Sequence, residues 1–208
     1  MIIGLVLASY LIGAIPFALL IARTQGVDIR HVGSGNVGAT NVFRSVGKGW
    51  GILTFVADVA KGWLPAALPG WLAAEALPIN AGLLCGCAAI IGHNWPVYLR
   101  FKGGKGVATS AGVLLGVAPL AVLIGLIAWV VTFALGRYVS VASICAATAI
   151  PVAGWVLYGA ENPVLATVLT GLGGLVIVRH RTNIQRIRAG TEHRFNRAHR
   201  KPTENETP

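Results

Sequence analysis

Long apolar stretches alternate along the chain with short polar ones, and this alternation is the main structural signal in the sequence. A helix needs roughly 20 apolar residues to cross a hydrocarbon core of about 30 Å. The apolar stretches, several of which reach that length, cover about residues 2–22, 50–74, 79–99, 107–135, 139–158 and 163–178. The pattern predicts an all-α integral membrane protein.

The fourth stretch is too long for a single span of ordinary length. It covers about 29 residues, 107–135, and contains Gly116, Val117, Ala118 and Pro119 near its middle. Proline interrupts a helix because its ring clashes with the preceding turn and it lacks an N–H donor. We therefore expect two shorter helices joined by a tight turn, which brings the total to about seven transmembrane helices. The alternative is a partly re-entrant hairpin, and the resulting five crossings would keep the same odd number.

The positions of the charges support an odd number of crossings. With seven, every lysine and arginine outside the spans lies on one side, and the opposite loops contain only Glu75 and Glu161 as charged residues. Because basic residues concentrate in cytoplasmic loops, we expect the N-terminus outside and the C-terminus in the cytoplasm. Residues 1–195 are predicted to form a single membrane domain with cytoplasmic loops at 31–48, 92–109 and 179–192, followed by a polar tail at 196–208.

Composition agrees with a membrane protein and narrows its partners. Of the 208 residues, 55% are hydrophobic and 12% charged, and the mean hydropathy is +0.70, which is unusual for a soluble domain. The net charge of +10 is explained by basic cytoplasmic loops, so no nucleic-acid partner is expected. The three cysteines lie in apolar segments without metal-ligand spacing, and we expect no metal and no cofactor.

The polar segment after the first apolar stretch has the composition of an anion site. Three glycines at positions 33, 35 and 38 allow the backbone to approach a ligand closely. Ser34 or Asn36 is expected to cap a helix whose free N–H groups face an anion. On that helix Thr40, Asn41 and Arg44 share one face, and the Arg44 guanidinium suits a phosphate. The alternative is a flexible linker with incidental polar residues.

The second polar segment contains the turn Gly103-Gly104-Lys105-Gly106 at the start of an apolar helix. Backbone donors, a helix N-terminus and an ammonium group together favour phosphate binding. It is not a Walker A loop, because no serine or threonine follows Lys105. The alternative is a basic turn whose lysine extends to the level of the lipid headgroups.

The third polar segment is predicted to be a short helix ending near Gly190. His180, Asn183, Ile184 and Ile187 would share one face of it, so that polar and apolar groups form a single stripe. Such a stripe can line a pocket. The alternative is a basic helix that binds anionic lipid beside the membrane.

Polar residues also occur inside or at the ends of the spans. Asp58 and Lys61 are three residues apart, a spacing that places them side by side on a helix. Neutralisation of one charge by the other is the favoured interpretation, although ionisable groups in a membrane are often functional. Ser140 and Ser143 lie where a later span begins on the cytoplasmic side, and either can complete the site.

The three segments, in this order and on one face, resemble the bacterial acyl-phosphate:glycerol-3-phosphate acyltransferase family. The resemblance covers essentially the whole chain and is carried by residues 33–44, 92–109 and 180–192. It implies that a fatty acyl group passes from acyl phosphate to the 1-hydroxyl of glycerol 3-phosphate, giving lysophosphatidic acid and inorganic phosphate. It also implies a multi-pass protein of the bacterial inner membrane with its active site facing the cytoplasm, and we expect it to act as a monomer.

The resemblance also assigns roles to individual residues. Ser34, Arg44, Lys105, His180 and Asn183 match residues that contribute to the reaction. Glu192 matches a structural position, and Ser143 is favoured over Ser140 as a further site residue. Positions expected to bind substrate phosphate are Asn36, Thr40, Asn41, Gly103, Gly104, Gly106 and Ser143.

No Ser–His–Asp arrangement is readable, so the expected mechanism is direct attack by the glycerol hydroxyl. The base is either His180, whose ordinary pKa suits proton transfer near neutrality, or the donor phosphate, which we favour. The alternative function is a transporter or channel for phosphorylated metabolites. It is disfavoured because all three anion-binding segments lie on one side, whereas alternating access places binding groups near the midplane.

Overall fold

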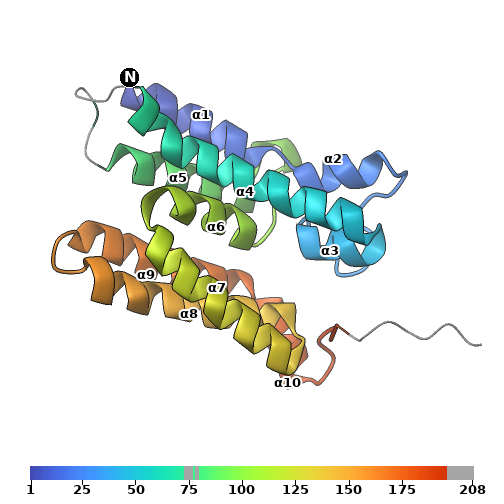
Figure 1. The fold of residues 1–208 in the computed structure, drawn as a ribbon. Helices are drawn as coiled ribbons and strands as arrows, with labels where there is room; N and C mark the ends of the chain where they lie inside the picture. Colours follow the sequence, from blue (N-terminus) through green and yellow to red (C-terminus); the bar gives the residue numbers. More distant parts are fainter. Residues whose placement is uncertain (73–76, 78–79, 196–208) are drawn as a thin grey trace, which may run out of the picture.

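The computed structural model describes residues 1–72, 77 and 80–195, and in these residues it contains helices and no strand. Glu75 and the predicted tail at 196–208 lie outside the described residues. The helices, shown in Figure 1, are α1 (Ile2–Ala14), α2 (Phe17–Arg23), α3 (Ala39–Ser45), α4 (Lys48–Trp71), α5 (Ala81–Asn94), α6 (Val107–Val117), α7 (Pro119–Gly136), α8 (Val139–Tyr158), α9 (Pro163–Arg179) and α10 (Arg181–Arg188), with a 3₁₀ turn at Val97–Leu99.

The predicted break in the fourth apolar stretch is confirmed. Helix α6 ends at Val117, and α7 begins at Pro119. Proline is well tolerated in the first turn of a helix, where its missing N–H costs nothing. Helix α6 is therefore short: its 11 residues reach about 16 Å at 1.5 Å per residue.

The first apolar stretch, predicted as one continuous span, is also broken. Helix α1 ends at Ala14, and α2 starts only at Phe17, after Pro16. A break inside a membrane leaves backbone carbonyls without partners. Here the Lys61 ammonium from α4 donates a hydrogen bond to the Ile15 carbonyl at 2.7 Å. The same ammonium lies 2.8 Å from a carboxylate oxygen of Asp58, so the expected ion pair is present and also stabilises the break.

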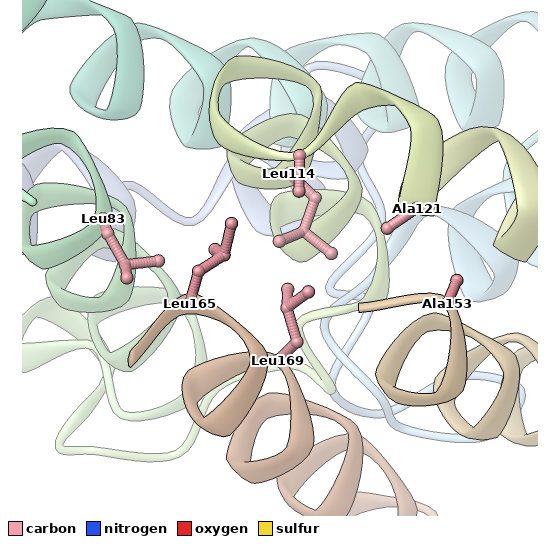
Figure 2. Close-up of a cluster of buried hydrophobic side chains, with 7 residues drawn as sticks. Leu83, Leu114, Ala121, Ala153, Leu165 and Leu169 are labelled. Atoms are coloured by element: carbon pink, nitrogen blue, oxygen red, sulfur yellow. The ribbon is translucent and has the colours of Figure 1, made fainter. Parts of the chain in front are cut away.

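The helices form two groups, with α1, α4, α5 and α6 on one side and α7, α8 and α9 on the other (Figure 1). Small residues let α4 and α6 approach closely: a side chain at Gly62 or Gly112 would collide with the backbone of the facing helix. The two groups share one apolar cluster (Figure 2), in which Leu83 of α5 and Leu114 of α6 face Leu165 and Leu169 of α9. This packing joins the two groups at the ends of the helices that lie away from the three polar segments.

In the part of the chain that the structure describes, four helical segments are long and apolar enough to cross a membrane: Ile2–Arg23, Lys48–Trp71, Pro119–Gly136 and Val139–Tyr158. Helices α9 and α10, bent by 53° at their junction, form a fifth candidate. Apolar side chains on the outside of α7, such as Leu123 and Ile127, are more than half exposed, as expected for a surface that contacts lipid. The count of seven spans and the orientation of the termini stay predictions.

Candidate active site

A cavity of about 140 Å³ brings all three polar segments together. The first segment contributes its loop and α3, the second contributes the start of α6, and the third contributes the junction of α9 and α10. The predicted site residues that line the cavity are Ser34, Asn36, Thr40, Asn41, Arg44, Lys105, Gly106, Ser143, His180, Asn183 and Glu192, and Ser140 lines it as well. Gly103 and Gly104 are the predicted site residues that do not line it.

The loop of the first segment is organised by the side chain of Asn41. Its amide nitrogen donates to the carbonyls of Ile29, Val32 and Asn36 at 3.1, 3.0 and 3.2 Å. Its amide oxygen accepts the backbone N–H of Ser34 at 3.0 Å. A buried amide that satisfies its neighbours in this way fixes the loop conformation. Asn41 therefore holds Ser34 at the cavity, and its own polar atoms are already hydrogen-bonded within the loop.

The predicted helix cap in this segment is wrong. Helix α3 begins at Ala39 and its cap position is Gly38, so neither Ser34 nor Asn36 caps it. Gly33 and Gly35 have φ angles of 57° and 67°, a left-handed conformation that glycine adopts most easily. These two turns direct Ser34 and Asn36 into the cavity wall instead of to the helix start.

The glycine turn of the second segment packs against the end of α5. The N–H groups of Gly103 and Gly104 donate to the carbonyls of Asn94 and His93 at 3.3 and 3.2 Å. A side chain at either glycine would collide with these residues. The two backbone donors expected to bind phosphate are thus hydrogen-bonded to the protein.

The start of α6 provides the free donors instead. Gly106, with a φ angle of 82°, precedes the helix, and Gly106, Val107 and Ala108 line the cavity. The first N–H groups of a helix have no partner within it, and they carry a partial positive charge that attracts anions. The Lys105 ammonium is adjacent, so two sources of positive potential face one cavity.

A hydrogen-bonded chain connects the second segment with the third. The Lys105 ammonium donates to the amide oxygen of Asn183. The Asn183 amide nitrogen donates to Glu192 at 2.7 Å, and the same carboxylate accepts from the Ser140 hydroxyl at 2.8 Å and from Arg186 Nε at 2.8 Å. The Glu192 side chain is 5% exposed. This chain orients Lys105 by fixing the amide of Asn183.

The environment of Lys105 makes its charge dependent on pH in an accessible range. Burial and then the positive charges of Arg186, Arg44 and Arg179 lower the pKa of Lys105 from 10.5 to about 8, although Glu192 opposes the shift. Burial disfavours an ammonium because its charge loses hydration.

Activity is therefore expected to fall as the pH rises through about 8, because deprotonation removes the positive charge that faces the cavity. The phosphates of the expected substrates lose their last proton near pH 6, so they would not cause this decline. The profile of kcat/KM between pH 6 and 10 reports groups of the free enzyme. In Lys105→Arg the alkaline decline should disappear, and a decline unchanged in this variant would assign it to another group.

His180 lies at the junction of α9 and α10 and is 3% exposed. Its Nδ1 is 2.8 Å from the carbonyl of Val176. Because a carbonyl only accepts hydrogen bonds, Nδ1 carries the proton, and in the neutral ring Nε2 is an acceptor. The ring can therefore accept a hydrogen bond from a hydroxyl group in the cavity.

The remaining walls are partly apolar. Phe55 of α4, Trp129 of α7 and Val139 of α8 line the cavity, and these helices carry many exposed apolar side chains outside it. Ser143 accepts a hydrogen bond from Trp129 Nε1 at 3.2 Å. The cavity therefore joins a cationic, polar side to helices that face lipid.

Arg179, which is not among the predicted site residues, links the second and third segments. Its guanidinium donates to the carbonyl of Gly104 through Nε at 3.1 Å and to the carbonyl of Gly103 through Nη2 at 3.0 Å. It also lies over the ring of Trp95, 5.5 Å from its centroid. A basic residue in the last turn of an apolar helix, directly before His180, was the available signal.

Comparison with known proteins gives one consistent group of relatives. Residues 3–190 match a family model described as glycerol-3-phosphate acyltransferase. Proteins of that name from Geotalea daltonii and Geobacter metallireducens are 46% and 51% identical; the alignments cover 94% and 92% of this chain and 98% and 96% of those proteins. Two crystal structures are similar, both of PlsY (YgiH), an integral membrane glycerol 3-phosphate acyltransferase. The glycerol 3-phosphate form has a TM-score of 0.86 and is 42% identical, and the match covers 94% of this chain and 96% of that one. The lysophosphatidic acid form has a TM-score of 0.83 and is 41% identical, and the match covers 94% of this chain and 95% of that one.

Proposed function

The chain belongs to the glycerol-3-phosphate acyltransferase family, and from this membership we propose that it transfers a fatty acyl group from acyl phosphate to the 1-hydroxyl of glycerol 3-phosphate. The products are lysophosphatidic acid and inorganic phosphate. The observation that supports this proposal best is the single cavity where Arg44, Lys105 and the start of α6 meet. Both proposed substrates carry phosphate, and cations lining one cavity can bind both phosphate groups.

The proposed reaction is a direct transfer. The 1-hydroxyl oxygen attacks the acyl carbonyl carbon, a new ester bond forms, and the bond between the carbonyl carbon and the phosphate oxygen breaks. Arg44 and Lys105 neutralise the charge that develops on the leaving phosphate, which is the kind of stabilisation that contributes most to such reactions. The apolar walls formed by Phe55 and Trp129 admit the acyl chain.

The proton of the attacking hydroxyl passes to the leaving phosphate, and His180 orients the hydroxyl through Nε2. This assignment predicts that His180→Gln keeps at least about a tenth of the wild-type kcat, because glutamine still forms hydrogen bonds but cannot act as a base. An obligatory general base contributes about 10²–10⁴-fold. A loss of that size in His180→Gln, with His31→Gln unchanged, would make His180 the base.

Roles within the loops follow from their contacts. Ser34, Thr40 and Asn36 are proposed to bind substrate phosphate together with the N–H groups of Gly106 and the start of α6. We assign Gly103 and Gly104 to the close packing that presents Lys105, because their N–H groups are already bonded. Asn41 and Glu192 are assigned to the support of Ser34 and Asn183.

The experiment that tests the function uses purified protein in detergent with palmitoyl phosphate and labelled glycerol 3-phosphate. Labelled lysophosphatidic acid is expected, and palmitoyl-CoA is the control donor. Product from palmitoyl-CoA alone would contradict the proposed donor. No product from either donor, in protein shown to be folded, would contradict the proposed reaction.

The same assay tests the proposed orientation, with the active site facing the cytoplasm of a bacterial cell. The basic loops at this end of the molecule support it. Glycerol 3-phosphate is charged and crosses bilayers poorly, so sealed inside-out membrane vesicles should be active at once. Activity that is immediate in right-side-out vesicles, and latent in inside-out ones, would reverse the orientation.

A further inference from the structure

The segment after α10 runs along the cavity edge and contacts α3, α7 and α8. We call residues 191–195 the C-terminal strap. Glu192 is bonded to Ser140 and Arg186 as described. Further on, Arg194 Nε donates to the carbonyl of Gly136 at 3.1 Å, and the Phe195 N–H donates to the carbonyl of Arg137 at 2.9 Å. The strap is thereby fixed to the turn between α7 and α8.

The last described residue of the strap, Phe195, lies between α7 and α3. Its ring centroid is 5.7 Å from that of Phe133 in α7, in an edge-to-face arrangement, and 5.8 Å from that of Phe43 in α3. Both separations are typical of favourable aromatic pairs. The guanidinium carbon of Arg44 lies over the same ring, 5.4 Å from the centroid. Phe195 therefore contacts the cation that the proposed function places on the leaving phosphate.

Arg44 needs such a contact because little else restrains it. Its side chain is long, it is exposed, and its Nε donates to the carbonyl of Thr40 at 3.3 Å in the preceding turn of α3. An aromatic face attracts a guanidinium and restricts it to a parallel plane. The in-plane N–H groups then remain free to point into the cavity.

We propose that Phe195 is a positioning residue for Arg44, holding the guanidinium in the orientation that binds the leaving phosphate. The inference rests on the proposed function, since it acts through the role of Arg44. Restricting a catalytic cation before the substrate arrives lowers the entropic cost of the transition state. The bonds of Glu192 and Arg194 fix the ring in place, so the strap is part of the active site.

The test is a double-mutant cycle on kcat/KM with palmitoyl phosphate and glycerol 3-phosphate. Phe195→Leu, which keeps an apolar side chain and removes the ring, should lower kcat/KM by about 3- to 30-fold, the range of cation–aromatic contacts. Phe195→Tyr should remain within about threefold of wild type because it keeps the aromatic face. In an Arg44→Ala background, Phe195→Leu should change kcat/KM by less than about twofold, because residues that act together are not additive.

A purely structural role for Phe195 gives a different result. Phe195→Leu would then lower kcat/KM by the same factor with and without Arg44, and Phe195→Tyr would lower it as much as Phe195→Leu does. Either result would overturn the proposal. Tyr138→Leu is the matched control, since Tyr138 makes the other cation–aromatic contact of the strap, with Arg194 at 5.7 Å. If Phe195→Leu fails to fold, Phe195→Met serves as the second variant without a ring. Wild-type protein inactive with acyl phosphate would refute the proposed function itself, whereas an active wild type with additive variants refutes only the role of Phe195.

Discussion

Lys105→Ala is expected to lower kcat/KM by two or more orders of magnitude while the protein folds and inserts normally. The Lys105 ammonium faces the cavity beside the start of α6 and is held by Asn183. Removing one preorganised donor from a site where charge develops costs about 10²–10³ in rate. The fold should survive because Asn183 keeps its bond to Glu192 at 2.7 Å.

Two variants separate this role from a general effect of charge. Lys48→Ala removes an exposed lysine at the start of α4, outside the residues that line the cavity, and should remain within about threefold of wild type, as surface changes usually do. Lys105→Arg keeps the charge but changes its geometry, and should recover part of the activity. Steady-state kinetics at pH 7, on protein with a normal thermal unfolding midpoint, gives the comparison. Near-normal turnover in Lys105→Ala would remove Lys105 from the proposed site.

The convergence of three segments could be predicted because it depends on order and charge alone. Glycine-rich loops separated by an even number of spans return to the same side of a membrane, and Arg44, Lys105 and His180 follow that rule. The break before Pro119 was equally readable, since proline has a strong local effect. These features need no knowledge of how distant helices pack.

Features that depend on distant partners could not be predicted. The break at Pro16 is tolerated because Lys61, in another helix, satisfies the Ile15 carbonyl. Arg179 acquires its role only where α9 meets the turn at Gly103 and Gly104. A proline in an apolar stretch predicts a break in the helix, but it does not predict which side chain will bond the exposed carbonyl. Likewise, a basic residue at the end of a helix does not predict which group will accept its hydrogen bonds.

The glycines at positions 103 and 104 pack against α5, whereas the sequence predicted that they bind phosphate. Backbone donors at Gly103 and Gly104 suggested a phosphate cradle, yet their N–H groups bind carbonyls of α5. Glycine is required there because no side chain fits against His93 and Asn94. In the proposed anion site, Lys105 and the start of α6 therefore provide the positive potential, and the glycines determine where these groups lie. A sequence identifies such residues without distinguishing binding from packing.

Glu192→Ala is expected to destabilise the protein by about 1–3 kcal/mol, the usual cost of leaving buried hydrogen-bonding groups without a partner. The carboxylate accepts from Ser140, Asn183 and Arg186, and Ser140 and Asn183 are each 5% exposed. Their donors would lose their partner in a buried environment. Activity should fall as well, because Asn183 also holds Lys105. The thermal unfolding midpoint in detergent measures the first effect and kcat/KM the second.

The pH dependence of this stability distinguishes the contribution of the negative charge of Glu192 from the contribution of its packing. Burial alone would raise the pKa of Glu192, but the hydrogen bonds from Arg186, Asn183 and Ser140 outweigh it and lower the pKa below its ordinary value of 4.5. A lowered pKa means that the stabilisation is fully present above about 4.5 and is lost as the pH falls through the folded value. Wild type should therefore lose more stability than Glu192→Ala between pH 7 and pH 3. Glu192→Gln, which keeps the shape but not the charge, should lie between the two at pH 7 and resemble Glu192→Ala in its flatter acid response. Equal acid responses in all three proteins would mean that Glu192 supports the site through its shape and not through its charge.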